Sequence, residues 1–248
     1  MLRSLVRWSD SRPGLRRARR ALSRAPLVSH AIEALDERRA RRLEEDGDPR
    51  GRSKQRWSEV GPGPGLTWGV ELSGESAVDV SERHGAFGDG RTILEIGPGY
   101  GRIMGAVLGR RLAFERYLAL ELSDQNVSHL REEFTDPRVE IVPGDAEATQ
   151  LDEEVDSAFS FLTFKHLYPS FESALTNLRP QLRDGGVVIF DLIEGSRSYF
   201  QRDEQTFVHE YTRAEAEELV ERSGLMLETF DTVDHAPGRT RMVVVARA

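Results

Sequence analysis

From about residue 91 onward, short apolar runs alternate with longer amphipathic segments, and this alternation restricts the fold more than any other feature. Apolar runs of this length are typical of buried strands, and the segments between them have the periodicity of helices. Strands alternating with helices form βαβ units, whose strands are parallel and whose helices cover both faces of the sheet. The predicted strands are Thr92–Ile96, Tyr117–Leu122, Val139–Val142, Ser157–Leu162, Gly186–Leu192, Met226–Phe230 and Met242–Ala246. The predicted helices between them include Asp124–Phe134, Phe171–Leu182 and Arg213–Ser223.

The last two predicted strands are separated only by residues 231–241, which contain the turn pair Pro237-Gly238. A connection of that length cannot carry a crossover helix, so these strands are expected to pair as an antiparallel hairpin. The sequence therefore predicts an α/β fold with a mostly parallel sheet and an antiparallel last strand.

The formal charge of −8 combines two opposite parts of the chain. Residues 1–56 hold 16 basic and 8 acidic residues, whereas residues 57–248 hold 18 basic and 34 acidic ones. This asymmetry predicts a basic N-terminal arm on an acidic domain. All basic residues except Lys54 and Lys165 are arginine, which is typical of a GC-rich genome. The arginine count is therefore weak evidence for nucleic-acid binding.

Within the arm, Leu15, Ala18 and Leu22 recur at helical spacing among arginines. A basic amphipathic helix can lie on an anionic membrane surface or contact nucleic acid. Its apolar face is narrow, which favours an arm that packs on its own domain or on the second subunit of a homodimer. No apolar run approaches the roughly 20 residues that span a bilayer, so we expect no integral membrane segment and a cytoplasmic protein.

Between the arm and the regular region, the sequence predicts a helix and a loop. The helix runs from about Ala31 to Asp46, and the stretch from Gly47 to Pro49 is read as its stop signal. Residues 61–65 alternate glycine and proline between Trp57 and Trp68, so they form a loop. The two tryptophans either cover a ligand as a lid or anchor the arm to the domain.

The strongest motif follows the first predicted strand, where Glu95 precedes glycines at positions 97, 99 and 101. Glycines allow positive φ angles and let a ligand approach the backbone closely. A dinucleotide fingerprint of the form G-x-G-x-x-G would need a glycine at position 102, which is Arg102. The second strand ends in Glu121, where a carboxylate can bind ribose hydroxyls, and the third is followed by Asp145 and Ala146.

Together with the segment from Leu178 to Val187, these motifs make residues 90–248 resemble the class I S-adenosylmethionine-dependent methyltransferases, of the small-molecule type. The resemblance implies a Rossmann-like, seven-stranded sheet and S-adenosylmethionine as cofactor. It also implies that Glu95 orients the cofactor's ammonium group, Glu121 holds the ribose, and Asp145 with the Ala146 amide reads the adenine. The cofactor-binding residues that it implies are Glu95, Gly97, Gly99, Gly101, Glu121, Asp145, Ala146 and Phe161.

Two features narrow the methylation chemistry. The chain has no cysteine, which excludes methylation of pyrimidine C5 through a thiolate adduct. Enzymes that methylate exocyclic base amines typically carry an Asn/Asp-Pro-Pro-aromatic tetrapeptide after strand four. Here residues 161–169 read FLTFKHLYP, which argues against that class.

His166 is the candidate catalytic residue in this segment. Many small-molecule members of the superfamily carry a histidine after strand four, close to the transferred methyl group. An ordinary histidine pKa near 6.5 suits deprotonation of a hydroxyl at neutral pH. His166 is therefore read either as a general base or as a residue that orients the loop.

Aromatic residues suggest where an acceptor would bind. Residues 194–211 form an insertion that commonly covers the acceptor in this superfamily, and an aromatic insertion is consistent with a small organic substrate. We expect the acceptor to enter between this insertion and residues 57–68, with Trp68, Tyr199 and Tyr211 as substrate residues. Asp156 starts strand four and no matching Asp-Asn pair follows, so no metal is predicted.

The sequence predicts S-adenosylmethionine-dependent methyl transfer to a small-molecule or glycosidic acceptor, most readily at a hydroxyl oxygen. Two alternatives stay open. One is a non-catalytic methyltransferase-like partner subunit, and the other is a nucleic-acid methyltransferase that uses the basic arm, against which the acidic domain argues. The predicted domains are a basic helical arm (1–56), a connector or lid (57–89) and a methyltransferase domain (90–248).

Overall fold

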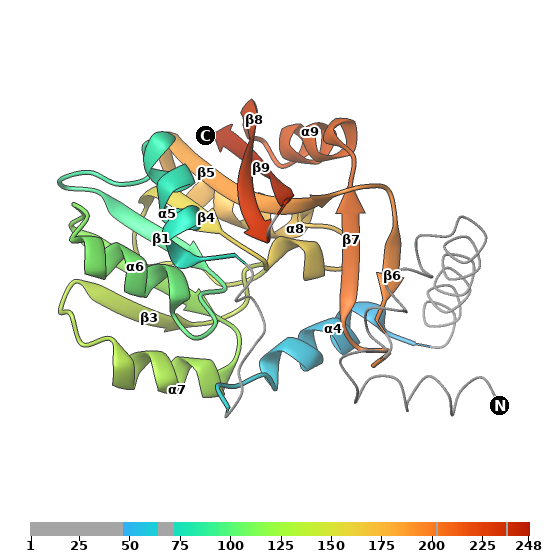
Figure 1. Cartoon of the computed structure of the whole chain (residues 1–248), viewed down its shortest axis with the longest axis horizontal. Coiled ribbons are helices and arrows are strands. Elements are labelled where there is room, and N and C mark those ends of the chain that lie inside the picture. The colour runs from blue at the N-terminus through green and yellow to red at the C-terminus, as the bar shows by residue number, and fades with distance from the viewer. Residues whose placement is uncertain (1–46, 64–71, 202, 237) are drawn as a thin grey trace.

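The computed structural model describes residues 47–63, 72–201, 203–236 and 238–248. A sheet forms its centre, with helices packed on both sides (Figure 1). The helices are α4 (Pro49–Ser58), α5 (Gly74–Arg83), α6 (Arg102–Arg110), α7 (Asp124–Glu133), α8 (Glu172–Leu178) and α9 (Arg213–Arg222), with short 3-10 turns at Phe164–His166 and Arg179–Gln181. The strands are β1 (Thr92–Ile96), β2 (Arg116–Glu121), β3 (Val139–Pro143), β4 (Val155–Ser160), β5 (Leu182–Glu194), β6 (Ser198–Phe200), β7 (Phe207–Tyr211), β8 (Met226–Ala236) and β9 (Arg239–Arg247).

The strand order confirms the predicted parallel sheet with an antiparallel last strand. Strands β3, β2, β1, β4 and β5 lie side by side in parallel. Strand β9 pairs antiparallel with β5 on one side and with β8 on the other, so β8 and β9 form the predicted hairpin. Each of the seven predicted strands is present.

The insertion after β5 forms two further strands that the sequence did not predict. Strands β6 and β7 form an antiparallel hairpin, and β7 joins β5 in parallel only through Ile193 and Glu194. The hairpin projects from the end of β5 beside α4 (Figure 1). It therefore extends the sheet on the side where β5 ends.

Alternating side chains of the central strands divide the core into two layers, one on each face of the sheet. On β5, Val188 and Phe190 pack with residues of α8 and α9, whereas Val187 and Ile189 pack with residues of α5, α6 and α7. Burying an apolar side chain of this size stabilises the fold by roughly 1.5–3 kcal/mol. The two layers fix the level at which the strands end, and so the position of the loops beyond them.

Two findings concern the region before residue 90. Asp48 caps the N-terminus of α4, since its Oδ1 accepts a hydrogen bond from Gly51 N at 2.9 Å and Pro49 begins the helix. The stretch read as a stop signal thus begins a helix, and the helix that it was predicted to end lies outside the described residues. Helix α5 contributes Val78 and Val80 to the core, so packing of the domain already includes this helix. The predicted helices before residue 47, and Trp68, lie outside the described residues.

Among the described residues, no helix is long and apolar enough to cross a membrane. In the same part of the chain, no group of three or more His, Asp or Glu side chains is arranged to hold a metal ion.

Candidate active site

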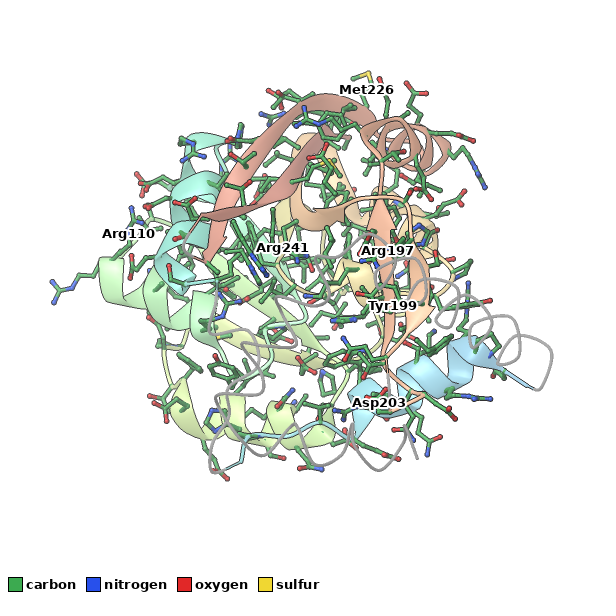
Figure 2. All side chains as sticks on the ribbon, turned by 45° about the vertical axis from the view of Figure 1, so that its right-hand side comes forward. Arg110, Arg197, Tyr199, Asp203, Met226 and Arg241 are labelled. Carbon is green, nitrogen blue, oxygen red and sulfur yellow. The ribbon has the colours of Figure 1, made fainter. Side chains whose placement is uncertain are left out.

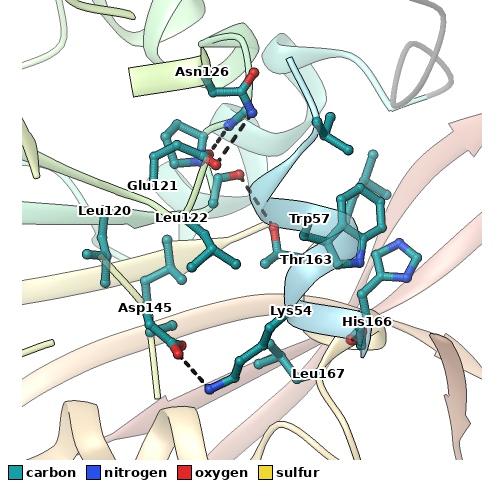
Figure 3. A pocket seen from close by; sticks show the side chains of 18 of the residues that line it. Lys54, Trp57, Leu120, Glu121, Leu122, Asn126, Asp145, Thr163, His166 and Leu167 are labelled. Atoms are coloured by element: carbon teal, nitrogen blue, oxygen red, sulfur yellow. Dashed lines mark hydrogen bonds and ion pairs between the residues drawn. The ribbon is translucent and has the colours of Figure 1, made fainter. Parts of the chain in front are cut away.

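A cavity opens where β1, β2 and β4 end, and α4 lies across it (Figure 3). Parallel strands bring the loops that follow them to one edge of the sheet, which is where open α/β folds bind ligands. Its lining includes most of the predicted cofactor residues together with four residues of α4. These residues are Gly97, Gly99, Glu121, Asp145, Ala146, Phe161 and His166 from the predicted set and Arg50, Ser53, Lys54 and Trp57 from α4.

The glycine loop turns the chain from β1 into α6. Gly97, Gly99 and Gly101 have φ angles of 69°, 61° and 85°, in the region that side chains disfavour. A Cβ at Gly97 would lie 2.4 Å from Thr163 Oγ1, and a Cβ at Gly101 would lie 2.2 Å from Phe134 Cε2. All three positions therefore favour glycine because of their positive φ angles. Gly97 and Gly101 also need it because neighbouring side chains leave no room for a Cβ.

Glu121 holds this loop from the end of β2. Its Oε2 accepts a hydrogen bond from Gly99 N at 2.9 Å, and its Oε1 accepts from Ser123 N at 2.9 Å and from Asn126 Nδ2 at 3.4 Å. Burial raises the pKa of the Glu121 carboxyl, and the hydrogen bonds from Ser123 and Gly99 oppose that rise. The sequence did not indicate Asn126, whose only signal is its place one turn inside the helix after Glu121.

Glu95 is buried beside the loop and, like Gly101, does not line the cavity. The Tyr117 hydroxyl donates a hydrogen bond to its carboxylate. Burial raises the pKa of the Glu95 carboxyl to about 7, although the hydrogen bond from Tyr117 and the charge of Arg102 lower it. Its ionisation at neutral pH therefore depends on small changes in its surroundings.

Asp145 lies at the other end of the cavity, after β3. Its Oδ1 accepts a hydrogen bond from Glu147 N at 2.9 Å, and Lys54 Nζ lies 2.5 Å from its Oδ2. Lys54 Nζ also lies 2.7 Å from Glu147 Oε2. The predicted adenine acid is thus one of two carboxylates bridged by a cation from α4, which the sequence analysis did not anticipate.

His166 lies in the short turn after β4, beside Trp57 (Figure 3). Its Nδ1 is 2.6 Å from the Phe207 carbonyl oxygen, and a carbonyl only accepts, so Nδ1 carries the proton and Nε2 keeps a lone pair. Burial lowers the pKa of the imidazole well below 6.5, and the Lys165 ammonium lowers it further. His166 is therefore neutral at pH 7 and can accept a proton at Nε2.

Helix α4 forms the wall beside His166. The rings of Trp57 and His166 are 4.4 Å apart, and Ser53 Oγ donates a hydrogen bond to the His166 carbonyl at 3.0 Å. The Trp57 indole Nε1 is buried without a hydrogen-bond partner among the described residues. Trp57 was predicted only as part of a lid or anchor, and its contact with His166 depends on tertiary packing.

A buried ion pair supports the segment that carries His166. Leu162, with a φ of 68°, donates its backbone N–H to Asp191 Oδ1 at 2.5 Å, and Asp191 pairs with Arg241 of β9. Figure 2 shows Arg241 in the interior of the molecule, whereas Met226 lies at its surface. Removing one partner of such a pair leaves a buried charge uncompensated, so the pair fixes this turn rigidly.

Of the predicted substrate residues, Trp68 lies outside the described residues, and neither Tyr199 nor Tyr211 lines the cavity. Tyr211 is fully buried in the core, where His209 stacks on it at 4.0 Å. Tyr199 lies on β6, where the Arg197 guanidinium is 5.4 Å from the centre of its ring (Figure 2). The physical reason is that the insertion pairs as a hairpin, which turns Tyr211 inward. The insertion contacts the site through the Phe207 carbonyl oxygen, which accepts the hydrogen bond from His166 Nδ1.

Part of the chain is similar to known methyltransferases. Residues 94–190 match the family described as methyltransferase domain. A fatty-acid O-methyltransferase of Mycolicibacterium smegmatis is 28% identical over 102 residues, which are 41% of this chain and 37% of that protein. The aligned region thus spans little more than a third of that relative.

Solved structures share the fold at low sequence identity. The 1,6-didemethyltoxoflavin-N1-methyltransferase of Burkholderia thailandensis, with bound 1,6-didemethyltoxoflavin and S-adenosylhomocysteine, is 20% identical and has a TM-score of 0.58 over 73% of this chain and 79% of that chain. The glycopeptide N-methyltransferase MtfA is 20% identical, with a TM-score of 0.59 over 71% of this chain and 96% of that chain.

The sheet order places the glycine loop and the cavity at the strand ends, where open α/β folds bind ligands. Residues 94–190 are a methyltransferase domain by their family match, and the solved methyltransferase structures share the fold of the chain. The predicted fold is confirmed, and the family match agrees with the predicted enzyme class.

Proposed function

We propose that the chain transfers a methyl group from S-adenosylmethionine to a small-molecule or glycosidic acceptor, at a hydroxyl oxygen. The observation that carries this proposal is the state of His166. Its Nδ1–H is fixed on the Phe207 carbonyl, so a neutral Nε2 is available in the wall of the cavity. A hydroxyl must lose its proton on methylation, and a neutral imidazole can take it.

The residues around the cavity fit this cofactor. Gly97 and Gly99 line the cavity, and a side chain at Gly97 would collide with Thr163, so the loop keeps its shape only with glycine there. Glu121 would hold the ribose hydroxyls, and Asp145 with the Ala146 amide would bind the adenine edge. Phe161 supplies apolar surface at the end of β4, and Glu95 would act on the ammonium group from behind the loop.

S-adenosylmethionine supplies a methyl group already activated by its sulfonium. The chain then has to position the acceptor, exclude water and remove one proton. Trp57 and His166 would border the acceptor, and His166 Nε2 would receive the hydroxyl proton. The positive charge of Lys165 lowers the pKa of the His166 imidazole, so the imidazole would release the proton to solvent.

Relatives support methyl transfer but differ in the atom methylated. The curated relative is named as an O-methyltransferase, whereas the two structural relatives are named as N-methyltransferases. Oxygen is favoured here because a neutral base stands ready at the site. One solved neighbour of 15% identity is a complex between the Haloferax volcanii Trm112 methyltransferase activator and a methyltransferase. A non-catalytic partner-subunit role is the alternative that the transfer assay below separates.

The test uses methyl-labelled S-adenosylmethionine and matched acceptors that differ only in a hydroxyl, an amine or a carboxyl group. Release of S-adenosylhomocysteine and label in the product are measured. We expect transfer to hydroxyl compounds. Cofactor binding with transfer only to amines would contradict the oxygen assignment, and binding with no transfer to any member would favour the partner-subunit alternative.

A further inference from the structure

Lys54 of α4 bridges two carboxylates at the adenine end of the cavity. Its Nζ lies 2.5 Å from Asp145 Oδ2 and 2.7 Å from Glu147 Oε2. Burial lowers the pKa of the Lys54 ammonium, but hydrogen bonds to Asp145 and Glu147 outweigh this, so the pKa lies above its ordinary value. The Lys54 ammonium is therefore charged at neutral pH.

The Lys54 ammonium contacts the Asp145 oxygen that the proposed function assigns to the adenine amino group of the cofactor. Asp145 Oδ1 already accepts from the Glu147 backbone, which leaves Oδ2 for an adenine amino group, and Lys54 contacts that oxygen. Two donors would then share one carboxylate oxygen. Lys54 Nζ and Asp145 lie together at one end of the cavity, opposite His166 (Figure 3).

Glu147 gives Lys54 a second position. The Glu147 side chain is only 3% exposed. Its other cationic neighbour is Arg50, whose Nη1 lies 3.7 Å from Glu147 Oε1. Lys54 can leave Asp145 and stay paired with the buried Glu147 carboxylate, so neither of these two charges is left buried without a partner. Helix α4 stays attached meanwhile through Ser53, which bonds to the His166 carbonyl.

From this arrangement, and given the proposed function, we propose that Lys54 gates the adenine end of the cofactor site. An adenine amino group displaces Lys54 from Asp145, and Lys54 remains on Glu147. The Asp145–Lys54 ion pair thus competes with the cofactor, and its strength sets part of the cofactor affinity.

The test is calorimetric titration of the full chain with S-adenosylhomocysteine, comparing wild type with Lys54→Met. Removing a partly exposed ion pair of about 0.2–1 kcal/mol should tighten binding about 1.4- to fivefold. Arg56→Met is the matched control, because it removes a cation of the same helix whose partner is Asp203, 3.6 Å away and outside the cavity lining. Its dissociation constant should equal that of wild type.

A salt series checks the same point without depending on one variant. Salt screens exposed ion pairs, so the wild-type dissociation constant should approach that of Lys54→Met between about 50 mM and 1 M salt. Equal or weaker binding by a folded Lys54→Met, with its melting temperature as check, would overturn the proposal. If that variant does not fold, wild-type affinity that fails to rise with salt overturns it. Absence of binding by every form would instead refute the proposed function.

Discussion

At the scale of single residues, Glu95 shows how burial sets a charge. The carboxyl has a pKa of about 7, so it gains its charge between pH 6 and pH 8. If the ionised form binds the cofactor's ammonium group, affinity for S-adenosylhomocysteine should rise about tenfold from pH 6 to pH 8. Calorimetric titration across this range tests the expectation. Glu95→Gln is the control, and an unchanged pH profile in that variant would exclude Glu95 as the source.

His166 has a pKa shifted in the opposite direction, because burial favours the neutral ring. Neutral imidazole therefore persists down to a pH below 6.5, and the acid limb of kcat/KM should lie below that value. His166→Gln should lower the methyl-transfer rate roughly 10²- to 10⁴-fold. Its affinity for S-adenosylhomocysteine should stay within about twofold of wild type. A wild-type rate in this variant would leave His166 only an orienting role.

At the scale of elements, the loop between β1 and α6 is the most constrained. Gly97→Ala combines a φ of 69° with a Cβ placed 2.4 Å from Thr163 Oγ1. It should lower the free energy of unfolding by roughly 1–3 kcal/mol. Gly109→Ala in α6 meets nothing within 4 Å and should raise it by roughly 0.5–1 kcal/mol. Urea unfolding of both variants measures this, and equal effects of the two would refute the steric argument.

The elements also show what sequence patterns reveal. Hydrophobic alternation predicted the strands and helices of the central sheet because these elements bury apolar side chains with a regular period. Helix α4 escaped detection because it is polar, with Ser53 as its only fully buried residue. Its place over the cavity depends on Lys54 and Trp57 meeting Asp145 and His166 from distant parts of the chain. No local pattern specifies such contacts.

The β6–β7 hairpin illustrates the same difference. The sequence marked an aromatic insertion after β5, but strands this short carry little periodic signal. Its pairing sends Tyr211 into the core and presents the Phe207 carbonyl to His166. The insertion therefore contributes to the site through its backbone, which composition alone does not reveal.

At the scale of the whole molecule, the fold places two ends of the cavity, marked by Asp145 and His166, under one helix. Asp145 follows β3, His166 follows β4, and α4 contacts both through side chains three residues apart. The sequence motifs predicted the residues that line the cavity from the ends of the strands, namely Glu121, Asp145 and the glycine loop. They did not predict helix α4, which covers the cavity through tertiary contacts.

Cofactor binding in this cavity is tested by calorimetric titration of the wild-type chain and Gly99→Arg with S-adenosylhomocysteine. Gly99 lines the cavity with a φ of 61°, so an arginine there would fill it. We expect one-to-one binding by wild type and loss of binding by a folded Gly99→Arg. No heat of binding in wild type, or equal binding by the variant, would contradict this expectation.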